Sequence, residues 1–466
     1  MPEHPYAHFI GAGGAGMSGI ALVLAARGIE VTGSDLKESR YSRALERAGV
    51  KITIGHAAEN LGNPDVVVIS SAISESNPEL AEARRRGLEV WPRARMLAHL
   101  AGERKTIAVA GTHGKTTTSS MVATMLSRLA LDPSFLIGGE VDGFDTNALN
   151  GSGEYYVVEA DESDGSFVYL DPYIAIVTNI EADHLDHYGT LEKVEETFGD
   201  FMSRVADAGA LVVCGDQPRL VELARATGRR VVTYGFSEGC DVRARTIGRE
   251  GVGLVFEVMT PDGKMATSVT TIPGIHMALN ATGVLAVAWV LGLELQSASE
   301  ALSTFTGVRR RFDLIGEEAG VTVVDDYAHH PTEVRATLAA ARSLDFSRVV
   351  VLFQPHRYSR TESLAREFGE AFEDADQVVL MDVYSAGEAP VPGVSGKTVL
   401  ESVLRAHPRT QAAYLPHRAD VVPYLAARMR AGDIVFTMGA GDVTAVGPEL
   451  VKELFGRKER EAATCR

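Results

Sequence analysis

The chain has 466 residues and a formal net charge of −17 at pH 7, with 45% hydrophobic and 23% charged residues. This length predicts about two to four domains, and the composition is typical of soluble globular proteins. The negative charge argues against a nucleic-acid partner, because no basic stripe offsets it. No stretch reaches the roughly 20 apolar residues of a membrane span, and no basic flank precedes an apolar core at the N-terminus. We therefore expect a cytoplasmic protein with no membrane partner.

A glycine-rich loop follows the first predicted strand. Residues 7–10 are apolar, residues 11–16 read Gly-Ala-Gly-Gly-Ala-Gly, and residues 17–26 predict a helix. A second strand ends in Asp35. This spacing fits G-x-G-x-x-G, in which the backbone approaches a pyrophosphate at a helix N-terminus. The pattern alone does not indicate NAD, because any diphosphate can bind there, and a purely structural glycine turn is the alternative.

A buried strand over residues 65–69 runs into Ser70-Ser71-Ala72-Ile73. Loops at the carboxyl ends of parallel strands are where ligands of such sheets bind. This first α/β unit is expected to end near Leu100, before a linker over residues 101–104.

The second unit opens with a phosphate-binding motif, Gly111-Thr112-His113-Gly114-Lys115-Thr116-Thr117-Thr118. An apolar strand, residues 107–110, precedes it, and residues 116–129 predict an amphipathic helix. Such a loop directs backbone N–H groups at a polyphosphate, while its lysine reaches the β- and γ-phosphates and a hydroxyl ligates Mg²⁺. Val109 stands where the usual pattern has a glycine, so this is a variant P-loop. The alternative is a glycine turn that caps a helix beside a solvated lysine.

Two acidic clusters follow predicted strands of the same unit. Residues 155–158 run into Glu159-Ala160-Asp161-Glu162-Ser163-Asp164, and residues 174–177 run into a segment that contains His184. Carboxylates at this edge of the sheet can hold Mg²⁺ beside the phosphates. His184 either binds or positions a second metal ion or caps its loop. Residues 241–272 predict an antiparallel patch, and a helix over residues 276–290 carries Asn280.

A third unit begins near Val308 and again alternates strands with helices. Its predicted strands are residues 321–324, 349–353, 377–380 and 433–436, and its predicted helices are residues 331–342, 361–372, 396–405 and 418–429. Cationic and imidazole side chains gather at its strand ends: Arg309, Arg310, Arg311, His329, His330, His356, Arg357 and Arg360. Arginine holds carboxylates and phosphates through paired donors. For Arg311 alone, an ordinary surface position is the expectation.

These three units together predict a reaction. A phosphate-binding unit, a nucleoside-triphosphate unit and a carboxylate-binding unit suit the joining of a carboxylate to an amine with ATP. Phosphoryl transfer to the carboxylate gives an acyl phosphate, which the amine attacks as phosphate leaves.

The order of the motifs resembles the Mur ligase family. The motifs GAGGAGMSG, GTHGKTTT, EADESDGSF, TNIEADHLDHY, GVRRRFD, DDYAHHPTEV, FQPHRYSRT and GAGD follow one another from about His8 to Gly447. The resemblance implies three α/β domains. These are a Rossmann-like UDP-sugar domain (residues 1–100), a P-loop domain with a mixed or parallel sheet that binds ATP (101–307), and a Rossmann-like domain (308–466) that binds the amino acid and completes the ATP site.

The first glycine loop favours the alanine-adding branch of this family. The resemblance then implies an ATP- and Mg²⁺-dependent ligase, with Mn²⁺ able to replace Mg²⁺. It would add L-alanine to the lactyl carboxylate of UDP-N-acetylmuramate in peptidoglycan precursor synthesis. We expect a monomer or a weak homodimer.

The resemblance also implies the roles of individual residues. UDP-sugar binding falls to Gly11, Ala12, Gly13, Gly14, Ala15, Gly16, Met17, Ser18, Asp35, Ser70, Ser71, Ala72 and Ile73, with His56 and Asn60 as further candidates. ATP binding falls to Gly111, Thr112, His113, Gly114, Lys115, Thr116, Thr117, Asn280, Arg310 and Asp326. The metal ligands would be Thr116, Glu159 and His184. Alanine would be bound by Tyr327, His329, Arg357 and Arg360, and the catalytic set would be Lys115, His184, His329 and Arg357.

The chain departs from the family pattern at one position and lacks a feature of several relatives. Met277 replaces the first asparagine of the usual His-Asn-x-x-Asn, while Asn280 keeps the second. Several related ligases use a carboxylated lysine near the metal. Lys193 is the only lysine that follows His184 closely, and it lies too early, so we expect no modified lysine.

Three other functions remain as alternatives. A recycling ligase that attaches a tripeptide to the same sugar nucleotide shares most motifs. An NAD-dependent dehydrogenase would explain only the first glycine loop and Asp35. A P-loop switch or transport ATPase would leave His329, Arg357 and Arg360 without a role.

Overall fold

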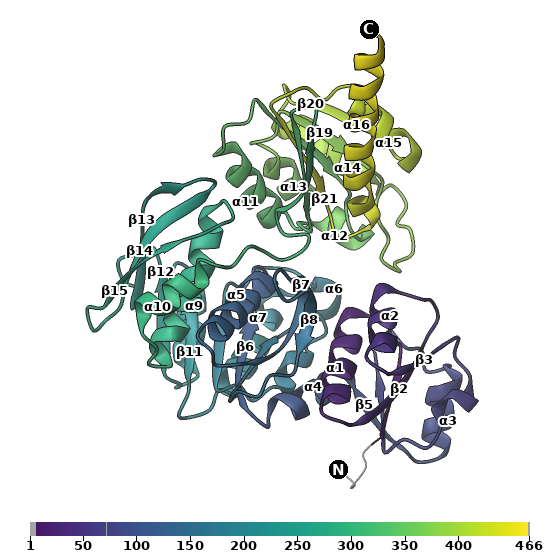
Figure 1. Cartoon of the computed structure of the whole chain (residues 1–466), viewed down its shortest axis with the longest axis vertical. Helices are drawn as coiled ribbons and strands as arrows, with labels where there is room; N and C mark the ends of the chain where they lie inside the picture. Colours follow the sequence, from purple (N-terminus) through teal and green to yellow (C-terminus); the bar gives the residue numbers. More distant parts are fainter. Residues whose placement is uncertain (1–5, 71, 465–466) are drawn as a thin grey trace. The chain divides into compact units, whose positions relative to one another are not determined.

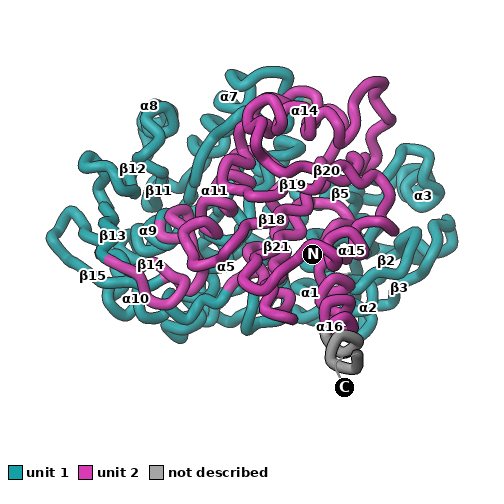
Figure 2. The backbone as a smooth tube through the Cα atoms, turned by 90° about the horizontal axis from the view of Figure 1, so that it is seen from above, with its two compact units in different colours: residues 1–247, 255–269, 279–306 teal, residues 248–254, 270–278, 307–466 magenta. Residues whose placement is uncertain are grey.

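The computed structural model describes residues 6–70 and 72–464, and three sheets organise them (Figure 1). The chain forms two compact units (Figure 2). Unit 1 comprises residues 1–247, 255–269 and 279–306, and unit 2 comprises residues 248–254, 270–278 and 307–466. The first two sheets lie in unit 1 apart from a few residues of β13 and β14, and the third sheet lies in unit 2. The domain boundaries expected after residues 100 and 307 stay predictions.

The first sheet has five parallel strands in the order β3-β2-β1-β4-β5. Its strands are β1 (Tyr6–Ile10), β2 (Glu30–Asp35), β3 (Lys51–Ile54), β4 (Val66–Ile69) and β5 (Glu89–Pro92). Its helices are α1 (Ala15–Ala26), α2 (Arg40–Arg47), η1 (Ala58–Leu61), α3 (Pro78–Arg85) and α4 (Arg93–Ala101). This is the 3-2-1-4-5 strand order of the doubly wound dinucleotide-binding fold without its sixth strand, so the Rossmann-like expectation is confirmed.

The second sheet has ten strands in the order β15-β14-β13-β12-β11-β10-β6-β9-β7-β8. They are β6 (Lys105–Ala110), β7 (Ser134–Val141), β8 (Thr146–Leu149), β9 (Tyr155–Glu159), β10 (Ile174–Val177), β11 (Ala210–Cys214), β12 (Val231–Gly235), β13 (Val242–Glu250), β14 (Gly253–Met259) and β15 (Met265–Val269). The strands at the phosphate-binding edge, β10, β6 and β9, are parallel. Strands β14 and β15 are antiparallel, which confirms the predicted patch.

Among the helices around the second sheet, α5 (Lys115–Arg128) is buried on more sides than the sequence predicted. These helices are α5, η2 (Ser166–Tyr169), α6 (Leu185–Tyr188), α7 (Leu191–Ser203), α8 (Pro218–Ala226), α9 (Ile275–Val290) and α10 (Leu295–Leu302). Every residue of α5 from Thr117 to Leu126 is buried, so the amphipathic prediction was wrong. Helix α5 packs against strands β6, β7 and β9 and also against α10, which covers it.

The third sheet has the order β16-β17-β21-β18-β19-β20, and only β16 runs antiparallel to its neighbour. Its strands are β16 (Asp313–Glu318), β17 (Val321–Asp326), β18 (Arg348–Phe353), β19 (Gln377–Leu380), β20 (Gln411–Tyr414) and β21 (Asp433–Met438). Its helices are α11 (Pro331–Arg342), α12 (Tyr358–Ser363), α13 (Ala365–Ala371), α14 (Gly396–Ala406), α15 (Arg418–Ala426), η3 (Asp442–Ala445) and α16 (Val446–Thr464).

The helix predicted over residues 361–372 is two helices, α12 and α13, which meet at Leu364. Two hydrophobic clusters pack on the third sheet, one containing Phe353, Phe368 and Phe436 and the other containing Val435 and Leu450. The three α/β sheets confirm the predicted fold class. In the part of the chain that the structure describes, no helix is both long and apolar enough to cross a membrane.

Candidate active site

The P-loop bends through two glycines that no other residue could replace without strain. Gly111 has φ 136° and Gly114 has φ 82°, values that L side chains rarely adopt. A Cβ on Gly111 would overlap the hydroxyl of Thr178. Gly114 is the residue before α5, so the helix N-terminus opens directly onto the loop. Val109 lies fully buried in β6, and the loop therefore begins only at Gly111.

Two residues that follow β10 hold the loop in this conformation. The backbone N–H of His113 donates to Asn179 Oδ1 at 2.8 Å, and Asn179 Nδ2 donates to the carbonyl of His113 at 2.9 Å. The Thr178 hydroxyl also donates to the carbonyl of His113, at 2.5 Å. Thr178 and Asn179 were not singled out from the sequence. Their place directly after a strand in the motif TNIEADHLDHY was the available signal.

Lys115 lies among carbonyl and carboxylate oxygens. Its Nζ donates to the carbonyls of Gly111 at 2.7 Å and Thr112 at 3.2 Å, and to Glu162 Oε1 at 2.8 Å. Burial alone lowers the pKa of Lys115, but Glu162, Asp161 and Glu159 outweigh it and raise the pKa above its usual value. Lys115 is therefore a cation at neutral pH, pointed at the loop that would cradle phosphates.

Glu162 is the principal residue that sequence reasoning missed in this cluster. Only 2% of it is exposed, and burial raises its pKa to about 7 although Lys115 acts in the opposite direction. Its backbone carbonyl accepts a short hydrogen bond from the Tyr188 hydroxyl. Glu162 was visible in the acidic cluster after β9, but the spacing gave no reason to choose it over its neighbours.

The expected metal ligands are only partly brought together. Thr116 Oγ1 donates to Glu159 Oε1 at 3.1 Å, so two hard oxygen ligands meet beside Lys115. His184 Nε2 lies 3.6 Å from Asp183 Oδ2 and 3.9 Å from Glu162 Oε1. His184 precedes α6 with φ 54°, but its side chain makes no capping hydrogen bond. The capping alternative for His184 therefore loses its support.

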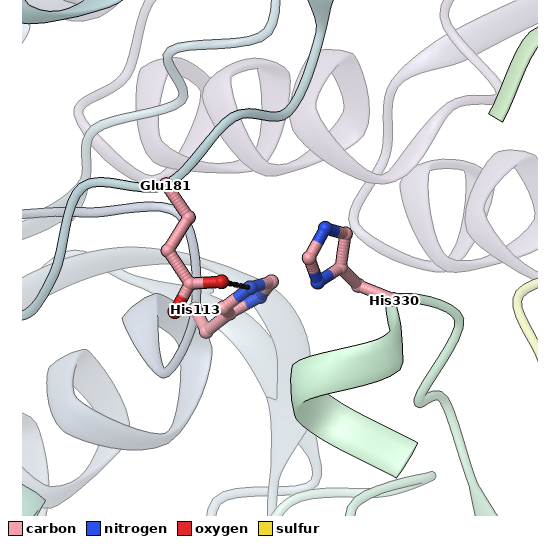
Figure 3. A group of neighbouring side chains, drawn as sticks. All are labelled: His113, Glu181 and His330. Carbon is pink, nitrogen blue, oxygen red and sulfur yellow. Dashed lines mark ion pairs between the residues drawn. The ribbon is translucent and has the colours of Figure 1, made fainter. Parts of the chain in front are cut away.

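His113 contacts an acid of the same motif. Its Nε2 lies 3.5 Å from Glu181 Oε2 (Figure 3). The backbone N–H of Glu181 donates to Thr112 Oγ1 at 2.9 Å, which ties the segment after β10 to the P-loop a second time. Thr112 and His113 thus shape the loop through their contacts with this segment.

Asn280 lies against the P-loop, as its assignment to the ATP site requires. A Cβ built on Gly114 would come within 3.1 Å of Asn280 Oδ1. Helix α9 carries this side chain, which is 8% exposed. Met277, at the position of the lost asparagine, is buried. The contact of Asn280 with adenine stays a prediction.

The first glycine loop is held by the end of β2. The backbone N–H groups of Gly11 and Ala12 both donate to the carbonyl of Ser34 at 2.9 Å. Asp35 Oδ2 accepts the N–H of Gly13 at 2.8 Å, so this carboxylate fixes the loop itself. Gly14 precedes α1, with open space where a side chain would lie. A phosphate can approach the helix N-terminus there.

The remaining residues assigned to the UDP-sugar differ in how they are placed. Met17 and Ser18 are buried in α1, and the Ser18 hydroxyl donates to the carbonyl of Ala15 at 3.0 Å. The assignment of these two residues to the UDP-sugar stays a prediction. Ser70 Oγ accepts the N–H of Ala72 at 3.3 Å, and Ile73 packs near Gly11. Ser71 lies outside the described residues.

The buried carboxylate of Glu79 supports the first glycine loop through Ser34, whose carbonyl accepts from that loop. Glu79 Oε2 accepts from the Ser34 hydroxyl at 2.5 Å and faces His8 Nε2 at 3.2 Å. Its Oε1 accepts from Asn60 Nδ2 at 2.7 Å and from the N–H of Ala57 at 3.1 Å. Burial by itself raises the pKa of Glu79, but these donors outweigh it and lower the pKa to about 2. Asn60 therefore belongs to this network.

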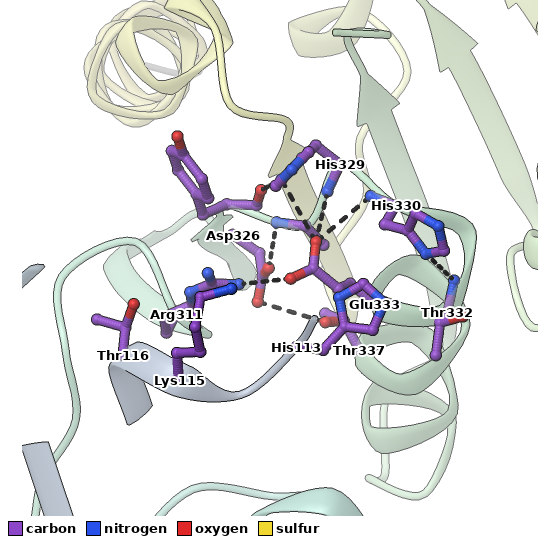
Figure 4. A network of polar contacts seen from close by, with 12 residues as sticks. His113, Lys115, Thr116, Arg311, Asp326, His329, His330, Thr332, Glu333 and Thr337 are labelled. Carbon is purple, nitrogen blue, oxygen red and sulfur yellow. Dashed lines mark hydrogen bonds and ion pairs between the residues drawn. The ribbon is translucent and has the colours of Figure 1, made fainter. Parts of the chain in front are cut away.

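Unit 2 carries a carboxylate-centred network at the end of β17 (Figure 4). Glu333 Oε1 lies 3.2 Å from Arg311 Nη1, and Glu333 Oε2 accepts the backbone N–H groups of His329 and His330 at 3.1 and 3.3 Å. The same bonds make Glu333 part of the capping box that starts α11. Arg311 is therefore an ion-paired residue with 26% of its side chain exposed, and the expectation of an ordinary surface position was wrong.

Arg310 and Asp326, both assigned to ATP, are not partners of each other in this network. Arg310 Nε lies 3.3 Å from Asp325 Oδ2, and its Nη2 donates to the carbonyl of Gly439 at 2.7 Å. Asp326 accepts the N–H groups of Phe312 and Ala328 at 2.9 and 2.7 Å. Burial raises the pKa of Asp326 to about 6, although Arg311 and these N–H groups act in the opposite direction.

Three of the four residues assigned to alanine form a connected chain of rings and cations. The rings of Tyr327 and His329 meet edge to face at 5.3 Å, and His329 meets His356 at 5.7 Å. Arg360 Nη1 lies 3.2 Å from His356 Nδ1, so His356 connects His329, which follows β17, to α12. Burial lowers the pKa of His329 to about 3, so its ring is neutral at pH 7.

Arg357, the fourth of these residues, directly precedes α12 as its N-cap residue. It has φ 68°, and its N–H donates to the carbonyl of Tyr384 at 2.8 Å.

Lys193, the lysine that we expected to remain unmodified, lies on the surface, with its Nζ 2.8 Å from Glu196 Oε2.

Three family models together match most of the chain. The Mur ligase family catalytic domain matches residues 6–105, the Mur ligase middle domain matches residues 109–288, and the Mur ligase glutamate ligase domain matches residues 310–441. These matches follow the three sheets in order.

Individual proteins resemble the chain over nearly its whole length. The UDP-N-acetylmuramate–L-alanine ligase of Anaeromyxobacter dehalogenans is 49% identical over 444 residues, which cover 95% of this chain and 96% of that protein. The solved UDP-N-acetylmuramate–alanine ligase of Thermotoga maritima has a TM-score of 0.81 at 29% identity, covering 97% of this chain and 100% of that one. A murein peptide ligase of Psychrobacter arcticus has a TM-score of 0.72 at 27% identity and covers 97% and 99% of the two chains. The resemblance found in the motifs is confirmed, and the chain belongs to the Mur ligase family.

Proposed function

We propose that this protein is an ATP-dependent ligase that joins L-alanine to the lactyl carboxylate of UDP-N-acetylmuramate. The observation that carries the chemistry is the P-loop, where Lys115 and Thr116 lie beside Glu162 and Glu159 at the ends of adjacent strands. The names of relatives that are about half identical over nearly the whole chain support the two substrates. The reaction belongs to peptidoglycan precursor synthesis in the cytoplasm.

The reaction proceeds in two steps. A carboxylate oxygen of the muramyl group attacks the γ-phosphorus of ATP, and ADP leaves, which gives an acyl phosphate. The amine of L-alanine then attacks the carbonyl carbon, and phosphate leaves with the oxygen that the carboxylate contributed. Lys115 stabilises the charge that moves onto the transferring phosphoryl group, since it is held as a cation beside the loop.

Divalent cations fit the donor set beside the P-loop. Thr116 and Glu159 are oxygen donors 3.1 Å apart, and Mg²⁺ commonly uses one or two protein ligands with phosphates and water completing the shell. His184 would serve a second ion. Mn²⁺ would be able to replace Mg²⁺, because both ions suit carboxylate and water ligands. Such ions neutralise phosphate charge when bound.

The other roles follow the three sheets. We assign residues 1–100 to the UDP-sugar, 101–307 to ATP, and 308–466 to the amino acid and to completion of the ATP site by Arg310 and Asp326. Tyr327, His329 and Arg360 gather at one end of the third sheet, as an amino-acid carboxylate site requires. Arg357 joins them in the proposal. We propose a monomer or a weak homodimer.

Phosphate release tests this function against its nearest alternative. The enzyme is incubated with ATP, Mg²⁺ and UDP-N-acetylmuramate, and then with L-alanine, with a muropeptide-type tripeptide or with no amino acid. Rapid phosphate release in the mixture with L-alanine, and in neither of the other two mixtures, supports the proposal. Release only with the tripeptide would assign the protein to the recycling ligases, and release without any acceptor would indicate an ATPase.

A further inference from the structure

Arg93 lies where the first glycine loop meets the rest of unit 1. It is the first residue of α4, directly after β5. Its guanidinium packs against the first turn of α1, since a Cβ built on Gly16 would come within 2.5 Å of Arg93 Nη1 and 3.2 Å of its Cδ. The glycine at position 16 thus leaves the space that the arginine fills, immediately beside the helix N-terminus.

The same guanidinium also faces the P-loop cluster. Arg93 Nη2 lies 3.5 Å from Asp161 Oδ2. Asp161 follows β9. Burial alone raises the pKa of Asp161, but the charge of Lys115 and other nearby groups outweigh burial and lower this pKa. One side chain therefore contacts both the helix of the first glycine loop and the acidic cluster around Lys115.

Its hydrogen-bonding capacity is largely unused. A guanidinium has five N–H donors. Within residues 6–70 and 72–464, the Arg93 side chain makes no hydrogen bond, and its one ion pair is the contact of 3.5 Å with Asp161. Only 27% of its side chain is exposed, so water reaches it partly. A half-buried guanidinium with so few partners is suited to an anionic ligand.

We propose that Arg93 binds an oxyanion of the sugar nucleotide and holds it between the first glycine loop and the P-loop. This inference rests on the proposed function. The helix N-terminus of α1 would receive the diphosphate, and the muramyl carboxylate must reach the γ-phosphate near Lys115. Arg93 contacts both places, so its planar donors can pair with either oxyanion through two parallel hydrogen bonds.

Substitutions at position 93 separate binding from folding. R93Q removes the charge, and R93K keeps the charge without the paired donors. R95Q is the matched control, because Arg95 lies on the same helix, is 51% exposed and stacks on Trp91 at 4.3 Å. G16A is an independent variant, because its Cβ would displace the Arg93 guanidinium.

Calorimetric titration with three ligands gives the readout: UDP-N-acetylmuramate, UDP-N-acetylglucosamine, which lacks the carboxylate, and ATP. We expect R93Q to weaken UDP-N-acetylmuramate binding by roughly 10- to 100-fold, R93K and G16A by less, and R95Q hardly at all. ATP affinity and the thermal midpoint should stay near wild type. Equal losses for both sugar nucleotides identify the diphosphate as the oxyanion, and a loss confined to UDP-N-acetylmuramate identifies the carboxylate.

Two results would overturn the inference. One is R93Q enzyme that binds UDP-N-acetylmuramate with wild-type affinity. The other is a variant whose ATP affinity and thermal midpoint fall together with sugar-nucleotide binding, since that indicates a structural role. Wild-type enzyme that fails to bind UDP-N-acetylmuramate at all would instead contradict the proposed function.

Discussion

Two buried carboxylates beside candidate sites have pKa values displaced in opposite directions. Glu79, under the first glycine loop, has a pKa lowered to about 2, whereas the pKa of Asp326, at the end of β17, is raised to about 6. Both side chains are at most 5% exposed, so burial alone does not explain the difference.

The difference lies in the groups around each carboxylate. Four groups stabilise the Glu79 anion: His8, the Ser34 hydroxyl, the Asn60 amide and the backbone N–H of Ala57. Asp326 accepts two backbone N–H groups and the Thr337 hydroxyl, but burial outweighs these bonds and the charge of Arg311, and the nearby Glu333 raises the pKa further. A carboxylate with satisfied hydrogen bonds builds the scaffold. A carboxylate whose pKa burial raises in spite of its hydrogen bonds is suited to a cation or to proton chemistry.

The comparison extends to Glu162, a third buried carboxylate, which pairs with Lys115 of the P-loop. Of the variants proposed, K115A should have the largest effect. Without Lys115, buried Glu162 loses its cation, and the transferring phosphoryl group loses its charge partner. We expect turnover to fall by at least about 10³-fold, measured by phosphate release. UDP-N-acetylmuramate affinity should stay near wild type, because its proposed site depends on Glu79.

K105A provides the control for K115A, because Lys105 lies at the start of β6 in an exposed pair with Glu154. Loss of sugar-nucleotide binding together with turnover in K115A would mean that the two regions are not separate in function.

The next largest effect is expected for E79Q, on stability. Because the folded pKa of Glu79 lies below its ordinary 4.5, its contribution is present above about pH 4.5 and is lost as the pH falls toward 2. The shift corresponds to about 3 kcal/mol. The thermal midpoint of E79Q should be lower at pH 7 and should change less between pH 6 and pH 3 than that of wild type.

E82Q serves as the control on the same helix, since Glu82 is paired with the surface arginine Arg85. If E79Q followed the wild-type pH profile with an unchanged midpoint, the description of Glu79 as a scaffold anion would be wrong.

D326N should show the opposite sign and a somewhat smaller effect. The folded pKa of Asp326 lies above its ordinary 3.8, so ionised Asp326 destabilises the fold above about pH 6. As the pH falls from 6 to 4, wild type recovers about 2 to 3 kcal/mol from this group. D326N lacks this titration, so the difference in thermal midpoint between pH 7 and pH 4 should be reduced. If D326N and wild type showed the same difference in thermal midpoint, ionised Asp326 would not destabilise the fold, and its contrast with Glu79 would be wrong.

N179A should have the smallest of these effects. It removes two hydrogen bonds that hold the backbone of His113, and each such bond contributes about 1 kcal/mol. We expect ATP affinity to fall by roughly 5- to 30-fold in a calorimetric titration. N63A, at an exposed position, should leave it unchanged. Wild-type ATP affinity in N179A would show that the loop needs no support from the segment after β10.

Sequence reasoning succeeded where chemistry depends on neighbouring residues. The P-loop, both glycine turns and the strand-end clusters were predictable because strand, turn and helix follow one another within a few residues. The loops then lie at the carboxyl ends of parallel strands.

Prediction from the sequence failed where the ion-pair partner of a side chain comes from a distant segment of the chain. Glu333 pairs with Arg311, 22 residues earlier, and Glu162 pairs with Lys115, 47 residues earlier. No spacing rule selects these partners among the many acids available. The amphipathic prediction for α5 failed for the same reason, because α10, which covers its outer face, lies far along the chain.

The most direct test of the central claim follows one oxygen atom. UDP-N-acetylmuramate labelled with oxygen-18 in the lactyl carboxylate is turned over with ATP and L-alanine, and the released phosphate is analysed by mass spectrometry. Transfer through an acyl phosphate predicts that one labelled oxygen appears in each phosphate, beside an alanylated sugar nucleotide. Unlabelled phosphate would mean that water attacks the γ-phosphorus and would contradict the proposed ligase chemistry.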